Sequence, residues 1–386
     1  MERDEGSGSA RPGPTRNSSL EAFTVALNET CDGTSWYTST KELQLASLEI
    51  CIACRSYPTV HLKVDDQIPR RLLAIADAPP PNPKRLCWTR VPRLRARHVT
   101  WNMPTAAELR TPIFAMTDVE YLEFGMGLKD GLDAVAWPQR LKTIHFHECS
   151  PFNQPLELVQ WPASLQRITF GADFNQPIER VGFPASLQQL IFLTSYSRFN
   201  QSIAGAILPA SLQLLALGMA FNQSIEDVVW PASLQQLTFG STFNQPIEGT
   251  VWPDSLQTPV FGCMFNQPVD NVKWPSSLQK LSFGWCESGN IRTIVFSNFN
   301  QRIGICAWRA SLRRLTLGHK FRQSLQGLGT WMPNLEVLRL LDFHYVGDIS
   351  VLRGIEWPKE LCHLTVLEGS SLGGVEIPSG VQVLFA

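Results

Sequence analysis

The side chains best suited to binding a partner are five bases in the last third of the chain: Lys280, Arg292, Arg313, Arg314 and Arg339. Each occupies a position at which a short sequence pattern, defined below, predicts a side chain on the open face of a sheet. Ammonium and guanidinium groups gathered on one surface attract carboxylates and phosphates. These bases also depart from the neutral residues at most of the matching earlier positions. We therefore predict a surface that binds an acidic segment of a protein partner.

Four glutamines hold the second position of the same pattern: Gln166, Gln188, Gln235 and Gln279. An amide side chain both donates and accepts hydrogen bonds, so a row of glutamines suits a polar binding surface. Copying of one repeated unit is the simpler explanation of the row, and a binding role is the alternative.

The sequence carries no motif that points to catalysis. A nucleophile elbow, a Walker loop and HExxH are all missing. Cys51 and Cys54 form a C-x-x-C pair, but a single pair is a weak zinc signal even with Cys31 and Cys87 elsewhere. No carboxylate or cysteine motif converges on His145 and His147. We predict no catalytic residues, no metal and no cofactor, and therefore a protein that is not an enzyme.

These residues are positioned by a 22-residue unit that dominates the chain. The unit is clearest at residues 230–251, which read W-P-A-S-L-Q-Q-L-T-F-G-S-T-F-N-Q-P-I-E-G-T-V. Its Phe-Asn-Gln triplet begins at Phe152, Phe174, Phe199, Phe221, Phe243, Phe265 and Phe299, with Phe-Arg-Gln at Phe321. The steps between these phenylalanines are 22, 25, 22, 22, 22, 34 and 22 residues. A period this constant predicts a solenoid whose units bury their apolar side chains against one another.

The pattern L-x-x-L-x-F marks one strand in each unit, because its fourth and sixth residues share one face of a strand. Its second, third and fifth residues then form the open face. The pattern predicts a curved parallel sheet of about thirteen short strands, including one at Ile291–Phe296 inside the 34-residue step. We expect the Asn of each triplet to be buried in a ladder of hydrogen bonds between units. The Gly after several strands, such as Gly240 or Gly262, suits a turn with positive φ.

The segments between strands usually contain two prolines, such as Pro231 and Pro246. Proline fixes φ and lacks an N–H group, so these convex segments are predicted to be mostly non-helical. Tryptophans recur at the repeat spacing. They are predicted to pack in the core, and stacking platforms for bases or sugars are the alternative interpretation.

This unit closely resembles the FNIP repeat, a 22-residue relative of the leucine-rich repeat. The resemblance covers residues 118–384 and is most specific over residues 160–303. It implies a leucine-rich-repeat-like solenoid with a curved parallel sheet on its concave side, and a role in protein interaction. The triplet at Phe321 departs from the pattern, because Arg322 replaces the ladder Asn, and no triplet follows Trp331.

Charge and hydropathy exclude several other classes. The formal net charge is −1 and charged residues make up 17% of the chain, which gives no overall electrostatic case for nucleic acid or membrane as a partner. No apolar run approaches the roughly 20 residues of a membrane helix. The scattered cysteines are typical of reduced thiols. We expect a cytoplasmic monomer, with a nuclear location as the alternative.

The chain divides into three parts by composition. Residues 1–34 predict a disordered polar tail. Residues 35–95 predict an irregular cap or a small adaptor module with a Pro-rich loop, in which residues 59–64 alternate like a strand. Residues 96–386 form the predicted solenoid. Two functions follow: a non-catalytic scaffold that binds a protein on its concave face, or the substrate-recognition subunit of a ubiquitin ligase with an adaptor-binding helical module at Ser35–Pro92.

Overall fold

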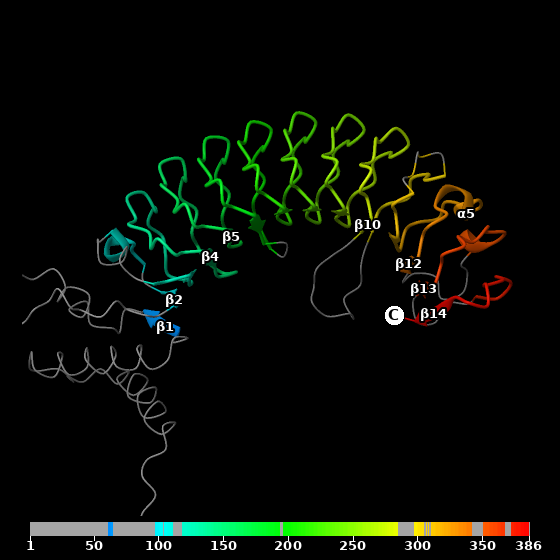
Figure 1. Cartoon of the computed structure of the whole chain (residues 1–386), viewed down its shortest axis with the longest axis horizontal. Coiled ribbons are helices and arrows are strands. Elements are labelled where there is room, and N and C mark those ends of the chain that lie inside the picture. The colour runs from blue at the N-terminus through cyan, green and yellow to red at the C-terminus, as the bar shows by residue number, and fades with distance from the viewer. Residues whose placement is uncertain are drawn as a thin grey trace, which may run out of the picture.

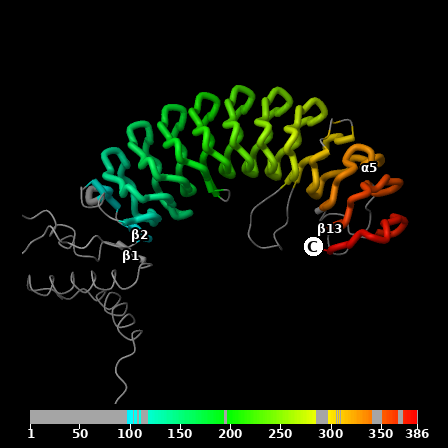
Figure 2. Tube along the Cα trace, in the orientation of Figure 1, coloured from blue at the N-terminus to red at the C-terminus, as the bar shows by residue number. Residues whose placement is uncertain are grey.

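A computed structural model describes residues 61–64 and 97–385, except 103, 111–117, 194–195, 285–296, 305, 307, 309, 342–349 and 367–371. The described solenoid is an arch, with its strands along the concave side and its connecting segments along the convex side (Figure 1). Successive turns have matching outlines along the arch (Figure 2). The predicted tail and most of the predicted cap lie outside the described residues.

One parallel sheet of fourteen described strands forms the concave side, and its strand order is the order of the chain. The strands are β1 His61–Val64, β2 His98–Trp101, β3 Tyr121–Phe124, β4 Thr143–Phe146, β5 Arg167–Phe170, β6 Gln189–Phe192, β7 Leu214–Ala216, β8 Gln236–Thr238, β9 Thr258–Phe261, β10 Lys280–Phe283, β11 Arg314–Gly318, β12 Val337–Leu341, β13 His363–Val366 and β14 Gln382–Phe385. The predicted solenoid is therefore confirmed. β1 confirms the strand predicted at residues 59–64 and extends the sheet into the segment predicted as a cap or adaptor module.

The convex segments are almost free of helix, as the prolines predicted. In the described residues, helical structure is limited to three short elements: η3 Ala107–Arg110, α5 Leu328–Trp331 and η4 Ser350–Leu352. Short turns such as that from Pro231 to Leu234 take the place of helices, because the carbonyl of the proline accepts the N–H of the leucine at 3.0 Å.

The core is a column of stacked side chains. The triplet phenylalanines Phe199, Phe221 and Phe243 stack with ring centroids 6.2 and 6.0 Å apart, and all three are fully buried. A second column contains Trp230, Trp252 and Trp274, which confirms that these tryptophans pack in the core. Burying one side chain of this size contributes about 1.5–3 kcal/mol, so each added unit stabilises its neighbours.

Two ladders of side chains connect the units on the solenoid surface. Asn222 Oδ1 accepts hydrogen bonds from the backbone N–H of Asn244 at 2.9 Å and from Gln245 Nε2 at 3.1 Å, and the same pattern runs along the other triplets. The predicted ladder is confirmed, but its asparagines are half-exposed or exposed, so the prediction that they are buried is wrong. A second ladder was not predicted: Ser233 Oγ donates to the carbonyl of Leu212 at 2.7 Å, and Ser255 Oγ to that of Leu234 at 2.7 Å.

The 34-residue step does not contain an additional unit of the sheet. β10 pairs directly with β11, and Lys280 lies opposite Arg314. Phe265 and Phe299 stack with centroids 6.1 Å apart, as neighbouring triplets do elsewhere. Since no gap remains between β10 and β11, the prediction of a sheet strand at residues 291–296 is wrong. Those residues, which lie outside the described part of the chain, are an insertion between Gly284 and Ser297.

Close packing of the units, and not positive φ, explains most glycines that follow strands. Only Gly284, with φ of 95°, has the left-handed backbone that was predicted for this position. A Cβ atom added to Gly240 would overlap the carbonyl oxygen of Gly218, and one added to Gly262 would overlap that of Gly240. Neither Gly240 nor Gly262 has a positive φ, so the prediction for these two positions is wrong. Glycine is needed at both because a side chain would prevent each turn from approaching the backbone of the turn before it.

Candidate partner-binding surface

Strand alternation determines which side chains reach the concave face. In β10, Leu281 and Phe283 are buried, whereas Lys280 is exposed and Ser282 is half-buried. The third and fifth residues of the pattern therefore lie on the side of the open face, because side chains of a strand alternate between its two sides. Neighbouring parallel strands lie about 4.8 Å apart, so equivalent residues of consecutive units form continuous rows.

Three of the predicted bases meet on this face. Lys280 of β10 and Arg314 of β11 are register partners, and Arg339 of β12 pairs with Thr316, two residues beyond Arg314. All three are exposed, and none of them forms an ion pair with a carboxylate of the described residues. We call Lys280, Arg314 and Arg339 the basic cluster. Like charges this close create a positive potential that an anionic group relieves.

Arg313, the second predicted base on β11's edge of the sheet, is paired within the solenoid and is not part of this cluster. Arg313 Nε lies 3.4 Å from Glu336 Oε1, and Arg313 Nη1 donates to the carbonyl of Asn334 at 3.1 Å. These contacts hold Arg313 just before β11 and pair its charge within the solenoid. Arg292 lies outside the described residues.

The four predicted glutamines lie one residue before the strands, along one edge of the sheet: Gln166, Gln188, Gln235 and Gln279. The carbonyl of each accepts two N–H groups of the next unit; for Gln235 the donors are Gln257 at 2.9 Å and Thr258 at 3.0 Å. Their side chains are exposed or half-buried. Their backbone carbonyls therefore connect the units, and every residue type has such a carbonyl.

The middle of the concave face carries no charge. Its rows contain Gln189 and Ile191 of β6, Leu214 and Ala216 of β7, and Gln236 of β8. Ile191 and Leu214 are half-buried. A partner that crosses the face would thus meet a neutral, partly apolar stretch before it reaches the basic cluster.

A polar aromatic cluster at the N-terminal end of the face was not predicted. The rings of His98 and Tyr121 have centroids 4.2 Å apart, and Tyr121 and His145 lie 6.4 Å apart. Thr100 Oγ1 donates to Glu123 Oε2 at 3.2 Å. Burial raises the pKa of Tyr121, with Glu123 adding to the rise, and burial lowers the pKa of His145. Only His145 was singled out from the sequence, because the others belong to units that match the repeat poorly.

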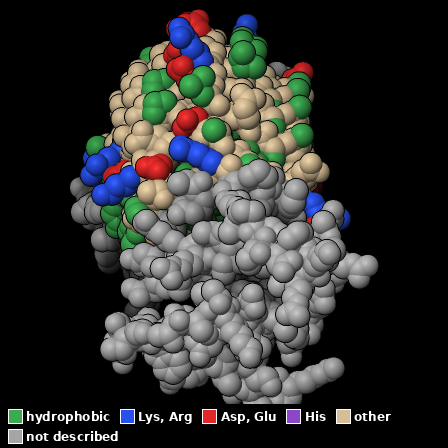
Figure 3. All heavy atoms as spheres, turned by 90° about the vertical axis from the view of Figure 1, so that its left-hand side faces the viewer, with side chains coloured by type: hydrophobic (Ala, Val, Ile, Leu, Met, Phe, Trp, Pro, Cys, Tyr) green, Lys and Arg blue, Asp and Glu red, His purple; other side chains and the backbone are tan. Residues whose placement is uncertain are grey.

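Charges of both signs surround this end of the arch. Glu120 Oε2 accepts a hydrogen bond from Lys142 Nζ at 2.9 Å, which lowers the pKa of Glu120, and Arg97 lies 3.6 Å from the same carboxylate. Basic and acidic side chains accordingly lie side by side at this end (Figure 3). Lys142 and Arg97 are therefore paired with a carboxylate, unlike the described bases of the basic cluster.

Potential metal ligands are scattered among the described residues. Within them, no group of three or more His, Cys, Asp or Glu side chains could hold a metal ion. Burial raises the pKa of Cys306 to about 12, which keeps its thiol protonated and unreactive at neutral pH. Cys51 and Cys54 lie outside the described part. Among the residues that the structure describes, a membrane-spanning helix is not found.

Comparison with protein families supports the assignment of the repeat. Residues 152–195, 199–242 and 243–286 match the family model described as FNIP Repeat. The chain contains FNIP repeats. These three matches include β5 to β10 and therefore reach the first base of the basic cluster, Lys280. A comparison with curated proteins gave no match.

Solved structures similar to this FNIP-repeat chain include CroV588, the TLR13–ssRNA13 complex and an internalin. CroV588, a circular leucine-rich-repeat protein, is 27% identical with a TM-score of 0.47, and the match covers 75% of this chain and 49% of CroV588. The TLR13–ssRNA13 complex gives 13% identity and a TM-score of 0.42, and the match covers 75% of this chain and 39% of the TLR13 chain. An internalin (inlF) of Listeria monocytogenes is 11% identical with a TM-score of 0.40, and the match covers 71% of this chain and 81% of the internalin. The chain thus spans about half the length of CroV588.

Proposed function

We propose that this protein is a non-catalytic interaction scaffold whose basic cluster binds an acidic segment of a protein partner on the concave face. Repeat solenoids are typical of interaction scaffolds, because stacking of short units builds a long continuous surface. The observation that carries the proposal is the register of Lys280 with Arg314, which places on adjacent strands two cations that form no ion pair within the described part of the chain.

The energetic argument favours an acidic segment over a neutral one. Assembling the basic cluster costs electrostatic free energy, since no described carboxylate neutralises it. A carboxylate-rich segment removes that repulsion and gains charge-assisted hydrogen bonds, which are stronger than neutral ones. The uncharged middle of the face then accommodates the remainder of the segment. Binding that depends on exposed charges should weaken as salt rises, since the Debye length is about 8 Å at physiological ionic strength.

Affinity capture with the full chain tests this proposal. The variant K280E/R314E/R339E reverses the basic cluster, and R180E/K273E/R302E makes the same change in net charge at exposed sites on segments between strands. We expect partners captured by the wild type to be retained by the second variant and reduced at least tenfold with the first. Equal loss with both variants, or no loss with the first, would refute a role for the basic cluster.

The ubiquitin-ligase hypothesis stays a sequence-based prediction. It requires an adaptor-binding module at Ser35–Pro92, and of that segment the structure describes only His61–Val64. Capture of a ligase adaptor by residues 1–96 would favour it.

A further inference from the structure

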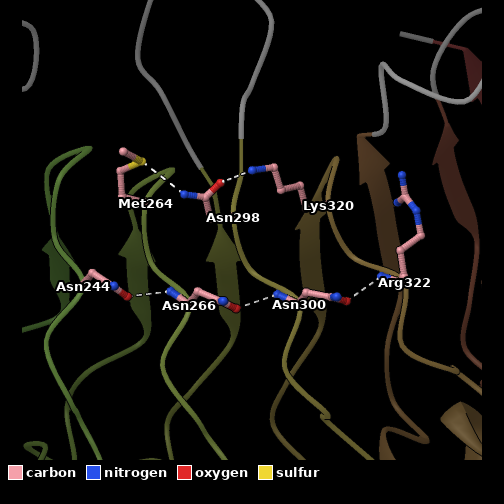
Figure 4. A pocket seen from close by; sticks show the side chains of 7 residues that line it. All are labelled: Asn244, Met264, Asn266, Asn298, Asn300, Lys320 and Arg322. Carbon is pink, nitrogen blue, oxygen red and sulfur yellow. Dashed lines mark hydrogen bonds between the residues drawn. The ribbon is translucent and has the colours of Figure 1, made fainter.

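A pocket of ≈490 Å³ lies outside the concave face, beside the asparagine ladder. It spans several consecutive turns of the solenoid, and Figure 4 shows the side chains that line it. These are Asn244, Met264, Asn266, Asn298, Asn300, Lys320 and Arg322. None of the seven is acidic, and two are cationic.

The ladder fixes the orientation of three amides in this pocket. The backbone N–H groups of Asn266, Asn300 and Arg322 donate to Oδ1 of the preceding ladder asparagine at 2.8, 2.9 and 2.8 Å. Since the oxygen of an amide group accepts hydrogen bonds and its NH2 group only donates them, each amide must direct its Nδ2 group away from the ladder. Within the described part of the chain, no group accepts a hydrogen bond from these three Nδ2 atoms. The pocket is therefore lined by a row of amide donors.

The two cations stand above this row, at the last turn that it reaches. Lys320 Nζ donates to Asn298 Oδ1 at 2.7 Å, and Asn298 Nδ2 in turn contacts Met264 Sδ at 3.2 Å. Arg322 Nη1 donates to the carbonyls of His319 and Phe321, both at 2.8 Å. These contacts fix both side chains before any ligand arrives, and such preorganisation lowers the entropy that binding costs. Arg322 stands where the repeat elsewhere has asparagine, so the cation replaces the residue that would have continued the ladder.

We propose that this pocket binds a phosphate monoester carried by a phosphorylated side chain of a protein partner. A phosphate dianion has three oxygens that accept several hydrogen bonds, which suits a lining of amides, one ammonium and one guanidinium. A pocket open to solvent suits a group that projects from a partner surface better than a free metabolite, which binds best where it is enclosed. The pocket is separate from the basic cluster, so this site goes beyond the function proposed above.

Retention on immobilised peptide libraries tests the proposal with the full chain. The probe is a library of phosphoserine peptides with random flanking residues, and its dephosphorylated form is the reference. We expect the wild type to be retained at least tenfold more by the phosphorylated library, and K320E/R322E to lose that preference. The K320E/R322E change leaves the backbone N–H of residue 322, and hence the ladder, in place. K273E/R302E carries the same change in charge and should behave as the wild type.

Three results would overturn the proposal: equal retention on both libraries, unchanged preference in K320E/R322E, or broadening of the ³¹P signal of inorganic phosphate by the wild type without retention on the library. The last would assign the pocket to free phosphate. If K280E/R314E/R339E, and not K320E/R322E, abolished retention, the phosphate would bind at the basic cluster instead. Circular dichroism of each variant verifies that the solenoid is folded.

Discussion

Phe283 and Phe299 stack with ring centroids 3.9 Å apart, although 16 positions separate them in the sequence. The corresponding pair Phe261 and Phe265, only four positions apart, stacks at 4.5 Å. The units before and after residues 285–296 thus pack directly against each other, as neighbouring units do elsewhere. This closure places Lys280 beside Arg314 and therefore creates the basic cluster.

Deleting residues 285–296 should leave the solenoid intact. The deletion joins Gly284 to Ser297 and restores the four-residue spacing from Phe283 to Phe299. Shortening a loop changes stability only slowly with length, so we expect a shift within about 1 kcal/mol in urea unfolding. A deletion of equal length at residues 240–251 removes half a unit and should unfold the protein. A comparable loss from both deletions would show that residues 285–296 are part of the packed core.

Substituting Gly240 with alanine should destabilise the solenoid. The added Cβ would overlap the backbone of Gly218, and overpacking of this kind costs about 1–3 kcal/mol. Gly182 is the matched control: no atom lies within 4 Å of its added Cβ, and its φ is not positive. Gly182→Ala should be neutral or stabilising by up to about 1 kcal/mol. Urea midpoints of the two variants measure the difference, and equal midpoints would contradict the close-packing argument.

The sequence predicted the architecture well because one physical requirement recurs in every unit. Leu237 and Phe239 must be buried in each copy, so the period of the phenylalanines alone predicted the stacked parallel sheet. The insertion was misassigned because Ile291, Ile294 and Phe296 satisfy the same apolar pattern, although β10 pairs directly with β11. A local pattern cannot show which strands are neighbours.

The candidate sites were less predictable than the fold. Lys280, Arg314 and Arg339 departed from the copied unit and were found on that ground. Arg313 was predicted on the same ground, but it pairs with Glu336, because adjacent units bring position 313 next to position 336. The sequence did not predict a site at Lys320 and Arg322. The replacement of a ladder asparagine by Arg322 was the only signal in the sequence, and the amide donors that surround the two cations come from three other units.

Removing one ladder acceptor should weaken the solenoid measurably. Asn222→Ala leaves the backbone N–H of Asn244 without its partner, and an unsatisfied donor costs about 1–3 kcal/mol when buried and less at this half-exposed site. We expect a loss of about 1 kcal/mol in urea unfolding. Asn222→Asp keeps an acceptor oxygen and should recover most of this loss. If Asp and Ala destabilised the protein equally, the amide would act through packing and not through its hydrogen bond.

Acidification should destabilise the N-terminal end of the sheet through His145. Burial is the largest influence on this ring and holds its pKa below the ordinary value of 6.5; the nearby Arg167 and His147 act in the same direction, and Glu123 opposes them. The unfolded chain therefore binds the proton more readily than the folded one. The stabilising contribution is complete above pH 6.5 and is lost as the pH falls through the ordinary value towards the lower folded pKa.

His145→Asn should remove this part of the acid sensitivity. We expect the urea midpoint of the variant to fall less between pH 7.5 and pH 5.5 than that of the wild type. His98 and His147 are present in both proteins, so their contributions cancel in the comparison. An identical fall in the two proteins would show that protonation of His145 is not coupled to folding.

Site-specific photo-cross-linking tests the central claim most directly. A photoreactive benzoylphenylalanine at Thr316, which lies on the concave face between Arg314 and Arg339, is compared with one at exposed Glu248 on the segment that follows β8. We predict that partner adducts form from position 316, that they are absent from position 248, and that they disappear when K280E and R339E are added. Adducts from position 248 together with none from position 316 would contradict binding on the concave face.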